Sequence, residues 1–420
     1  MTSVDSTSNP AEPAPIKAKA RIQALDLIRG LAILGILAVN ADGFAAPMSA
    51  SLKPSMWPIP NEGWTAISYW VMQAFFHEKF VTLFSMLFGV SLFLVGGERS
   101  DKVRGKVLWR RLAVLFVLAM IHGFGIWWGD ILSLYAITGA VMLFFRSWKP
   151  RPLMILGVAL YAGMGLWHVD PATLPFTRPQ ARAEATARLV PPPEVTARRK
   201  VKAAAEMAQA KGSWAGAYRV NTREYRRITS GYPWQIPSTL GLMMIGLSLF
   251  KSGFMAGRSS TRRYVVVGLA GAAALVPVAW LAWREVIAES PVLQTHLLEL
   301  ALTPLISLAY LSGLVLLLRA GAARALAPLA AAGRMAFTNY LTQSLIMTTI
   351  FYGGRGALMG EVDRPMLWAL VLAIWALQLV WSPLWLSRFE MGPFEWVWRC
   401  LTYGRRFPLR RLDRQAGARD

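Results

Sequence analysis

Long apolar runs recur along this chain, and many are long enough to cross the hydrocarbon core of a bilayer. A core of about 30 Å needs about 20 mainly apolar residues in helical form. Because lipid offers no hydrogen-bond partners, a spanning segment must satisfy its own backbone, and an α-helix does so. The short alternating segments of a β-barrel are missing from the sequence. The sequence therefore predicts an all-α fold, a polytopic transmembrane helical bundle.

About ten segments are predicted to span the membrane. They are residues 25–43, 76–97, 107–126, 130–146, 152–168, 234–251, 263–283, 296–318, 335–352 and 366–386. The loops between them alternate in charge: "ERSDKVRGKVLWRR" and "KSGFMAGRSSTRR" are basic, whereas "GFGIWWGD" has no Lys or Arg. Since basic loops stay in the cytoplasm, both termini are predicted to be cytoplasmic.

The formal net charge of +22 suggests nucleic-acid binding at first sight. The Lys and Arg residues gather between apolar runs, however, which is the pattern that orients a membrane protein. We therefore expect membrane lipids and no nucleic acid as partners. The single cysteine, Cys400, excludes a cysteine-based metal cluster. With no metal-ligand spacing in the sequence, we expect no metal site and no tightly bound cofactor.

Five segments are predicted along the chain. They are a disordered cytoplasmic N-terminus (1–22), an N-terminal transmembrane bundle (23–168), a basic extracytoplasmic loop that is partly helical (169–232), a C-terminal transmembrane bundle (233–388) and a basic, amphipathic cytoplasmic tail (389–420). The centre of the loop, "VTARRKVKAAAEMAQAKGSW", favours a helix. Two interpretations remain open: a solvated helical excursion, or a basic helix that lies on anionic headgroups or gathers an anionic substrate.

Ionisable and strongly polar residues inside spans are costly, so each is a candidate functional residue. In the first span, Asp26 and Arg29 are three residues apart, which places them on one helix face. Asn40 lies about three turns further along nearly the same face. These three residues are candidate substrate-binding residues. The alternative is an ion pair at the cytoplasmic end plus an interfacial asparagine.

The same stretch carries a resemblance. The pattern R-x-x-x-L-D-x-x-R-G-x-x-x-x-G-x-x-x-x-N, from Arg21 to Asn40, resembles the opening helix of the YeiB-like family of bacterial inner-membrane proteins, which contain a domain of unknown function. Four further segments resemble that family: "KFVTLFSMLFGVSLFL", "GDILSLYAITG", "GRMAFTNYLTQSLIMTTIFYG" and "GPFEWVWRCLTYG". The resemblance covers nearly the whole chain and implies a multi-pass protein of the bacterial inner (plasma) membrane.

The first-helix pattern is also similar to that of transmembrane acyltransferases of the heparan-glucosaminide N-acetyltransferase type. That similarity implies transfer of an acyl group from cytoplasmic acyl-CoA, as a co-substrate, to an extracytoplasmic glycan or lipid. This chain departs from the acyltransferase pattern, because it has no histidine between Asn40 and Trp64. The catalytic histidine of those enzymes therefore cannot be carried over.

The stretch "IHGFGIWWGDILSLY" offers a replacement. His122 ends one predicted span, three glycines allow a tight return, and Asp130 begins the next span. Both side chains are then expected at the outer surface, where Asp130 orients His122 and His122 acts as a general base. We predict His122 and Asp130 as catalytic residues, with Tyr135 bounding the substrate pocket. The alternative is a helix cap at Asp130 and an interfacial histidine.

Three more polar residues are candidate substrate-binding residues. His77 is expected at the outer end of its span, where the chain turns inward; its alternative is an ordinary interfacial charge cluster with its neighbours. Asn339 and Gln343 are four residues apart in one span and either line a cavity or join helices by hydrogen bonds. A small-molecule transporter or a non-catalytic membrane component remains an alternative to the enzyme, and a homo-oligomer stays open.

Overall fold

A computed structural model of the protein describes residues 23–51, 53–167, 178–180, 184, 192–288 and 293–411. Within these ranges the fold consists of helices and one isolated β-bridge, which confirms the all-α prediction. The elements are α1 (Gln23–Ala45), η2 (Pro54–Met56), α2 (Gly63–Val71), η3 (Met72–Phe76), α3 (Lys79–Gly96), α4 (Lys102–Gly125), α5 (Leu132–Met142), α6 (Pro150–Trp167), α8 (Pro193–Gly212), α9 (Trp214–Ser230), α10 (Tyr232–Lys251), α11 (Thr261–Ala288), α12 (Leu293–Arg319), α13 (Ala327–Arg334), α14 (Ala336–Phe351), α15 (Arg364–Arg388) and α16 (Pro393–Tyr403). The N-terminus predicted to be disordered, residues 1–22, lies outside the described residues.

Among the residues that the structure describes, six helices are long and apolar enough to cross a membrane, so the chain is an integral membrane protein. They are α1, the nearly continuous segment Gly63–Gly96, α4, α11, Leu297–Arg319 of α12, and α15. The other four predicted spans coincide with α5, α6, α10 and α14. Of these, α5 has only 11 residues and is shorter than predicted. At about 1.5 Å per residue it measures roughly 16 Å, about half the thickness of the hydrocarbon core. Ten crossings and cytoplasmic termini stay predictions.

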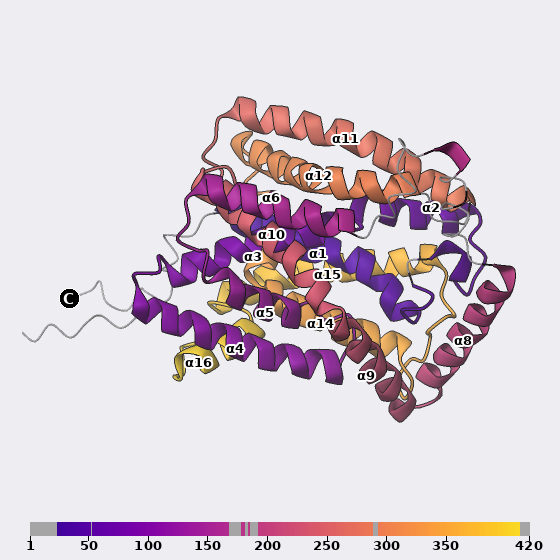
Figure 1. The fold of residues 1–420 in the computed structure, drawn as a ribbon. Coiled ribbons are helices and arrows are strands. Elements are labelled where there is room, and N and C mark those ends of the chain that lie inside the picture. The colour runs from indigo at the N-terminus through magenta and orange to yellow at the C-terminus, as the bar shows by residue number, and fades with distance from the viewer. Residues whose placement is uncertain are drawn as a thin grey trace, which may run out of the picture.

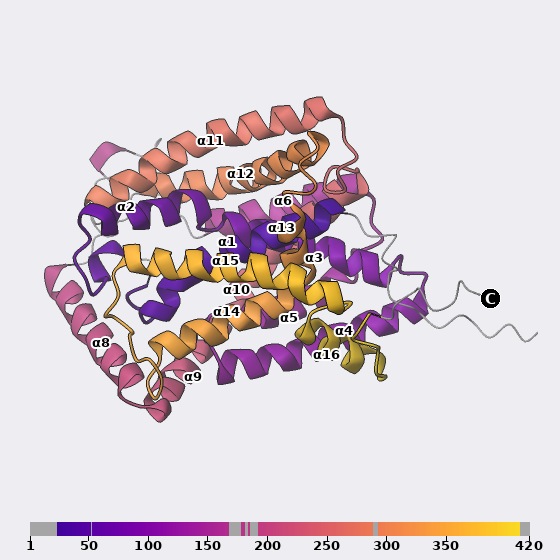
Figure 2. The same cartoon turned by 180° about the vertical axis from the view of Figure 1, so that it is seen from behind.

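The long helices run in broadly one direction, with α8 and α9 at one end of the bundle and α16 at the other (Figures 1 and 2). Helix α1 lies at the centre and packs against α3, α12, α13, α14 and α15. Helix α10 packs against α3 and α6. The two predicted bundles, 23–168 and 233–388, therefore share their packing interfaces. The hairpin α11–α12 forms one side of the molecule.

The chain turns near His77, as the sequence predicts. Element η3 is a turn of π-helix, and Glu78 has a φ of 62°, in the left-handed region that few residues other than glycine adopt. Helix α3 then starts at Lys79. This break divides the long apolar stretch 63–96 into two helical parts.

Glycines allow α1 and α13 to approach each other at backbone distance. A Cβ atom added at Gly333 would lie 1.8 Å from the carbonyl oxygen of Asp26, and one at Gly30 would lie 2.1 Å from the carbonyl oxygen of Leu329. Such approaches are typical of helix packing in membranes. The hydrophobic effect does not drive helices together in lipid, and small residues let their backbones come close enough for van der Waals contact. The contact holds Asp26 and Arg29 beside the start of α14.

We expect Gly333→Ala to lower the stability of the folded bundle by roughly 1–3 kcal/mol or more, because the methyl group meets rigid backbone. Thermal unfolding in detergent or nanodiscs measures this change. Gly313→Ala in α12 is the matched control, since a Cβ there meets no atom within 4 Å. Equal melting temperatures for the two variants would contradict the close approach.

Candidate functional site

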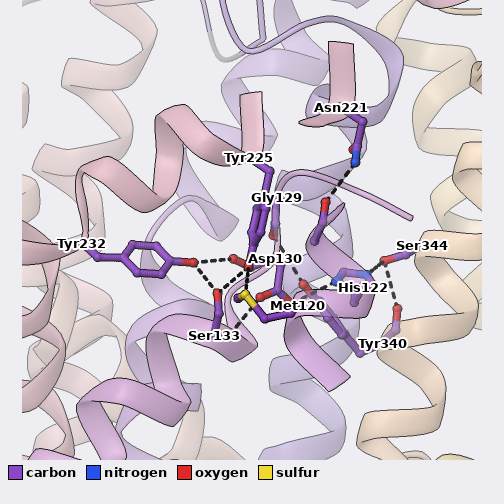
Figure 3. A network of polar contacts seen from close by, with 11 residues as sticks. Met120, His122, Gly129, Asp130, Ser133, Asn221, Tyr225, Tyr232, Tyr340 and Ser344 are labelled. Atoms are coloured by element: carbon purple, nitrogen blue, oxygen red, sulfur yellow. Dashed lines mark hydrogen bonds and ion pairs between the residues drawn. The ribbon is translucent and has the colours of Figure 1, made fainter. Parts of the chain in front are cut away.

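The centre of the candidate site is a buried imidazole–carboxylate pair. His122 lies in the last turn of α4, and Asp130 follows the short return that leads into α5. The Nδ1 atom of His122 is 2.9 Å from Oδ1 of Asp130, and the side chains are 1% and 0% exposed. The predicted meeting of these residues is present in the structure (Figure 3). Both are buried within protein, whereas the sequence predicted the outer surface.

Asp130 makes the contacts that both alternatives from the sequence require, one with His122 and one with the start of α5. Its Oδ2 atom accepts a hydrogen bond of 2.9 Å from the backbone N–H of Ser133, in the first turn of α5. Its Oδ1 atom accepts from His122. Since a carboxylate can only accept, Asp130 holds the neutral imidazole in the tautomer with the proton on Nδ1. The lone pair on Nε2 is then available for another donor.

That donor comes from α14. The Oγ atom of Ser344 lies 2.9 Å from Nε2 of His122. One turn earlier on the same helix, the ring of Tyr340 packs 5.1 Å from the imidazole, and its hydroxyl donates a 3.4 Å hydrogen bond to the carbonyl of Gly129. Two chain segments thus meet at His122: the α4–α5 return, through Asp130, and α14, through Ser344 and Tyr340.

The α8–α9 hairpin, residues 193–230, covers the return between α4 and α5. The side-chain amide of Asn221 donates hydrogen bonds of 2.9 and 3.0 Å to the carbonyls of Gly123 and Phe124. Tyr225 donates a 3.1 Å hydrogen bond to Ser133, and its ring occupies the space that a side chain at Gly123 would need. This part of the predicted basic loop is helical, as expected, but it is docked on the bundle.

A cavity of about 320 Å³ approaches the same pair from the opposite end of the bundle. Its inner part is apolar and is bounded beside the His122–Asp130 pair by Ile131, Leu132 and Tyr340. Its other end is polar and lies between the first turn of α1, α13, α16 and the start of α4. From Arg111 to His122 the chain rises eleven residues along α4, or about 16 Å.

Cationic side chains dominate the polar end of the cavity. It is lined by five arginines and two carboxylates: Arg29, Arg104, Arg111, Arg334, Arg399, Asp26 and Glu395. Several guanidinium groups are fixed in place, since Arg29 pairs with Asp26 at 2.9 Å and Arg111 stacks 3.7 Å over the ring of Trp398. Such an excess of guanidinium groups suits a phosphate-bearing ligand.

Glu395 connects α16 to the start of α14. Its Oε1 atom accepts hydrogen bonds of 2.8 and 3.1 Å from the backbone N–H groups of Phe337 and Thr338. Burial raises the pKa of this carboxyl, while its hydrogen bonds with Thr338 act in the opposite direction. A carboxylate at a helix N-terminus satisfies donors that the helix leaves unpaired. The position of Tyr340 and Ser344 therefore depends on α16 as well.

The remaining predicted residues fall into separate places. Asp26 and Arg29 form their predicted ion pair and line the polar end of the cavity. Asn40 is half-buried near the end of α1. Tyr135 is buried with its hydroxyl 2.8 Å from Ser85, away from the hydrogen bonds around His122. Their roles in substrate binding stay predictions.

His77 belongs to a second buried cluster. Its Nδ1 atom is 3.2 Å from the amide of Gln73 and 3.9 Å from the carboxylate of Glu299. Lys79, which is fully buried, donates a 3.2 Å hydrogen bond to Glu299. This cluster joins η3 and α3 to α12 and does not line the cavity below His122.

Asn339 and Gln343 join α14 to its neighbours by side-chain hydrogen bonds. The amide of Gln343 donates to Gln378 at 2.8 Å, and that of Asn339 donates to Ser382 at 3.2 Å. Trp381 donates back to Asn339 at 3.0 Å. These contacts match the helix-joining alternative that the sequence left open.

Sequence reasoning did not assign a role to Ser344, Tyr340, Tyr225 or Arg111. Ser344 and Tyr340 are four residues apart and share a helix face, which is a visible pattern, but nothing local indicates that this face meets His122. Among the described residues, no group of three or more His, Cys, Asp or Glu side chains is placed to hold a metal ion.

We expect Asn221→Ala to loosen the α8–α9 hairpin, because two carbonyls at the end of α4 lose their donor. The loss is about 1–3 kcal/mol for buried groups left unpaired. Hydrogen exchange of residues 214–230 measures it as faster exchange. Arg226→Ala, an exposed change on the same helix, is the control and should exchange like the native protein. Unchanged exchange in Asn221→Ala would show that these bonds do not hold the hairpin.

Comparisons with known proteins identify the family. Residues 249–405 match the family model described as "Protein of unknown function (DUF418)". The chain is 31% identical to the uncharacterized protein YxaH of Bacillus subtilis (strain 168), over 93% of this chain and 96% of that protein. It is 30% identical to the uncharacterized protein YeiB of Escherichia coli (strain K12), over 90% of this chain and 95% of that protein. No solved structure matches the chain. The chain belongs to the YeiB-like family of membrane proteins, as its sequence motifs indicated.

Proposed function

We propose that this protein is a membrane acyltransferase that moves an acyl group from a cytoplasmic donor, such as acyl-CoA, to a hydroxyl or amine of an extracytoplasmic glycan or lipid. One observation carries the proposal. The cavity begins among five arginines and ends in an apolar part against Tyr340, which packs on His122. A ligand with an anionic head and an apolar or extended arm fits this gradient.

The polar end of the cavity supplies the binding energy for the donor. Guanidinium groups form charge-assisted and often bidentate hydrogen bonds with phosphates. The apolar walls then favour an acyl chain or the extended arm that carries it. The distance of about 16 Å along α4 gives that arm room to extend from the arginines toward His122.

The His122–Asp130 pair supplies the acid–base chemistry. Asp130 holds the Nδ1 proton, so Nε2 can take a proton from an attacking hydroxyl or amine and later return it to the leaving group. The carboxylate also stabilises the imidazolium that forms on the way. No resident cofactor is needed for this reaction, because the acyl donor is a co-substrate.

The orientation of the protein follows from its charge pattern. Placing the basic loops in the cytoplasm puts both termini and the arginine end of the cavity there, and the α8–α9 hairpin outside. We extend this to ten crossings of the bacterial inner membrane. The resemblance of the first helix to transmembrane acyltransferases supports the same direction of transfer, and family likeness alone would not establish it.

We expect His122→Ala to reduce acyl transfer by about a hundredfold or more, the usual share of general acid–base catalysis. Purified protein in lipid nanodiscs is mixed with radiolabelled acetyl-CoA, or a longer acyl-CoA, and an extract of glycans and lipids. Release of CoA coupled to label on an acceptor measures transfer. Ser312→Ala is the control, because this buried serine bonds the carbonyl of Leu308 within α12, away from His122.

Two outcomes would contradict the proposal. Equal transfer by His122→Ala would remove the histidine from the reaction. The absence of both CoA binding and transfer across several acyl chains would favour transport, and substrate flux without covalent change would then establish a transporter.

We expect Arg111→Gln to raise the KM for acyl-CoA by about ten- to a hundredfold with little change in kcat, because one charge-assisted contact contributes about 1.5–3 kcal/mol. Arg319→Gln is the matched control. Arg319 lies at the same end of the bundle, bonds Thr261 and the carbonyl of Gly257, and does not line the cavity. A KM that rises equally in both variants would indicate a general charge effect.

A further inference from the structure

We infer that Ser344 is the nucleophile of the reaction and carries the acyl group as a covalent ester between donor and acceptor. The inference rests on the proposed acyl transfer and adds a covalent nucleophile to it. The juxtaposition that supports it is the continuous hydrogen-bonded series Ser344–His122–Asp130, buried between α14, α4 and the start of α5 (Figure 3).

The geometry is that of an activated serine. The distance from Oγ of Ser344 to Nε2 of His122 is 2.9 Å, and the distance from Nδ1 of His122 to Oδ1 of Asp130 is also 2.9 Å. A nucleophile bonded to a base, which is itself oriented by a third group, is the arrangement that activates a hydroxyl. This arrangement is recognised by geometry and roles rather than by order along the chain.

The hydrogen-bond pattern favours Ser344 as the donor to His122. Because Asp130 keeps the proton on Nδ1, the neutral imidazole has an acceptor at Nε2 and no donor there. The other acceptor for the Ser344 hydroxyl is the carbonyl of Tyr340, one turn earlier, at the longer distance of 3.3 Å. The shorter contact, to the imidazole, therefore directs the serine proton toward the base.

Tyr340 separates Ser344 from the cavity. Its side chain lines the apolar end of the cavity and packs on the imidazole of His122. The 3.4 Å hydrogen bond from its hydroxyl to Gly129 is long, and so is a weak restraint. The proposed reaction requires the Tyr340 side chain to rotate, so that a donor arm in the cavity reaches Ser344.

The reaction consists of two consecutive acyl transfers, one to Ser344 and one from it. Ser344 Oγ attacks the thioester carbonyl, His122 takes the hydroxyl proton, and the carbon–sulfur bond breaks as the thiolate leaves with that proton. An ester now joins the acyl group to Ser344. An acceptor hydroxyl or amine then attacks this ester, gives its proton to His122, and Ser344 leaves with the proton restored.

A covalent ester at this place separates the two half-reactions in space. The donor reaches Ser344 through the cavity from the arginine end, and the acceptor approaches from the side covered by the α8–α9 hairpin. The donor can leave before the acceptor arrives. A bulky donor and a bulky acceptor therefore never share the 320 Å³ cavity.

The experiment uses an alkyl fluorophosphonate, which reacts with activated serines and needs no knowledge of the natural donor. Native protein in nanodiscs should be labelled on the peptide that contains Ser344. Labelling should vanish in Ser344→Ala and slow by about a hundredfold or more in His122→Ala. Ser312→Ala should label like the native protein. No label on the native protein, label on another residue, or equal labelling in His122→Ala would overturn the inference.

A second variant tests the same position in case Ser344→Ala does not fold. Cys400 is the only native cysteine, so Ser344→Cys combined with Cys400→Ser leaves one thiol. That thiol should react with iodoacetamide much faster when His122 is present than in the His122→Ala background, because the thiolate is the reactive form. Equal rates would overturn the activation of this position.

The radiolabel assay distinguishes the two proposals. Transfer that persists in Ser344→Ala would overturn the covalent ester and leave the proposed acyltransferase in place. Labelling of Ser344 by the fluorophosphonate in a protein that transfers no acyl group would support the nucleophile and overturn the acyltransferase.

Discussion

The hydrogen bond between His122 and Asp130 is the contact on which the packing of α4, α5, α9 and α14 around it depends. A carboxylate whose side chain is 0% exposed inside a membrane protein is costly unless donors surround it. Asp130 obtains them from the imidazole and from the N–H of Ser133. The Ser133 hydroxyl then contacts Tyr225 and Tyr232, which lie on or beside the hairpin over the site. One buried carboxylate thereby positions His122, the start of α5 and the covering hairpin.

Helix α14, which contacts His122 through Ser344, is fixed in place by hydrogen bonds to α15 and α16. The carboxylate of Glu395 in α16 accepts a hydrogen bond from a backbone N–H in the first turn of α14. The side chains of Gln343 and Asn339, both in α14, donate hydrogen bonds to side chains of α15. Buried polar groups that are fully paired favour one arrangement of helices over others, since a shift would leave them unpaired in an apolar medium. These amides therefore support the site without touching the imidazole. Their role is to keep the Ser344 face of α14 against α4.

The molecule has two different approaches to one residue. The arginine-lined cavity leads to Tyr340 from one end, and the α8–α9 hairpin closes the other end through Asn221. For a reaction between groups on opposite sides of a membrane, such an arrangement keeps a continuous leak pathway out of the fold.

The helices, the turn near His77 and the His122–Asp130 pair could be predicted from the sequence, because each depends on residues that are close together in the chain. Apolar length predicted the helices, and the left-handed turn at Glu78 occurs where the apolar stretch exceeded the membrane thickness. His122 and Asp130 were predicted to meet because a return of a few residues leaves them little freedom. The docking of α8 and α9 was missed, although Ala203 and Ala210, seven residues apart on α8, offered small apolar contacts on one helix face.

The sequence by itself determined a helical membrane protein, its family and the imidazole–carboxylate pair. Only the tertiary structure decided that Ser344, 222 residues after His122, completes the series, and that arginines from α1, α4, α13 and α16 line one cavity. The physical reason is that apolar residues facing lipid and those facing another helix look alike in sequence. Hydropathy defines which segments enter the membrane, whereas close packing at glycines and paired polar groups selects which faces meet.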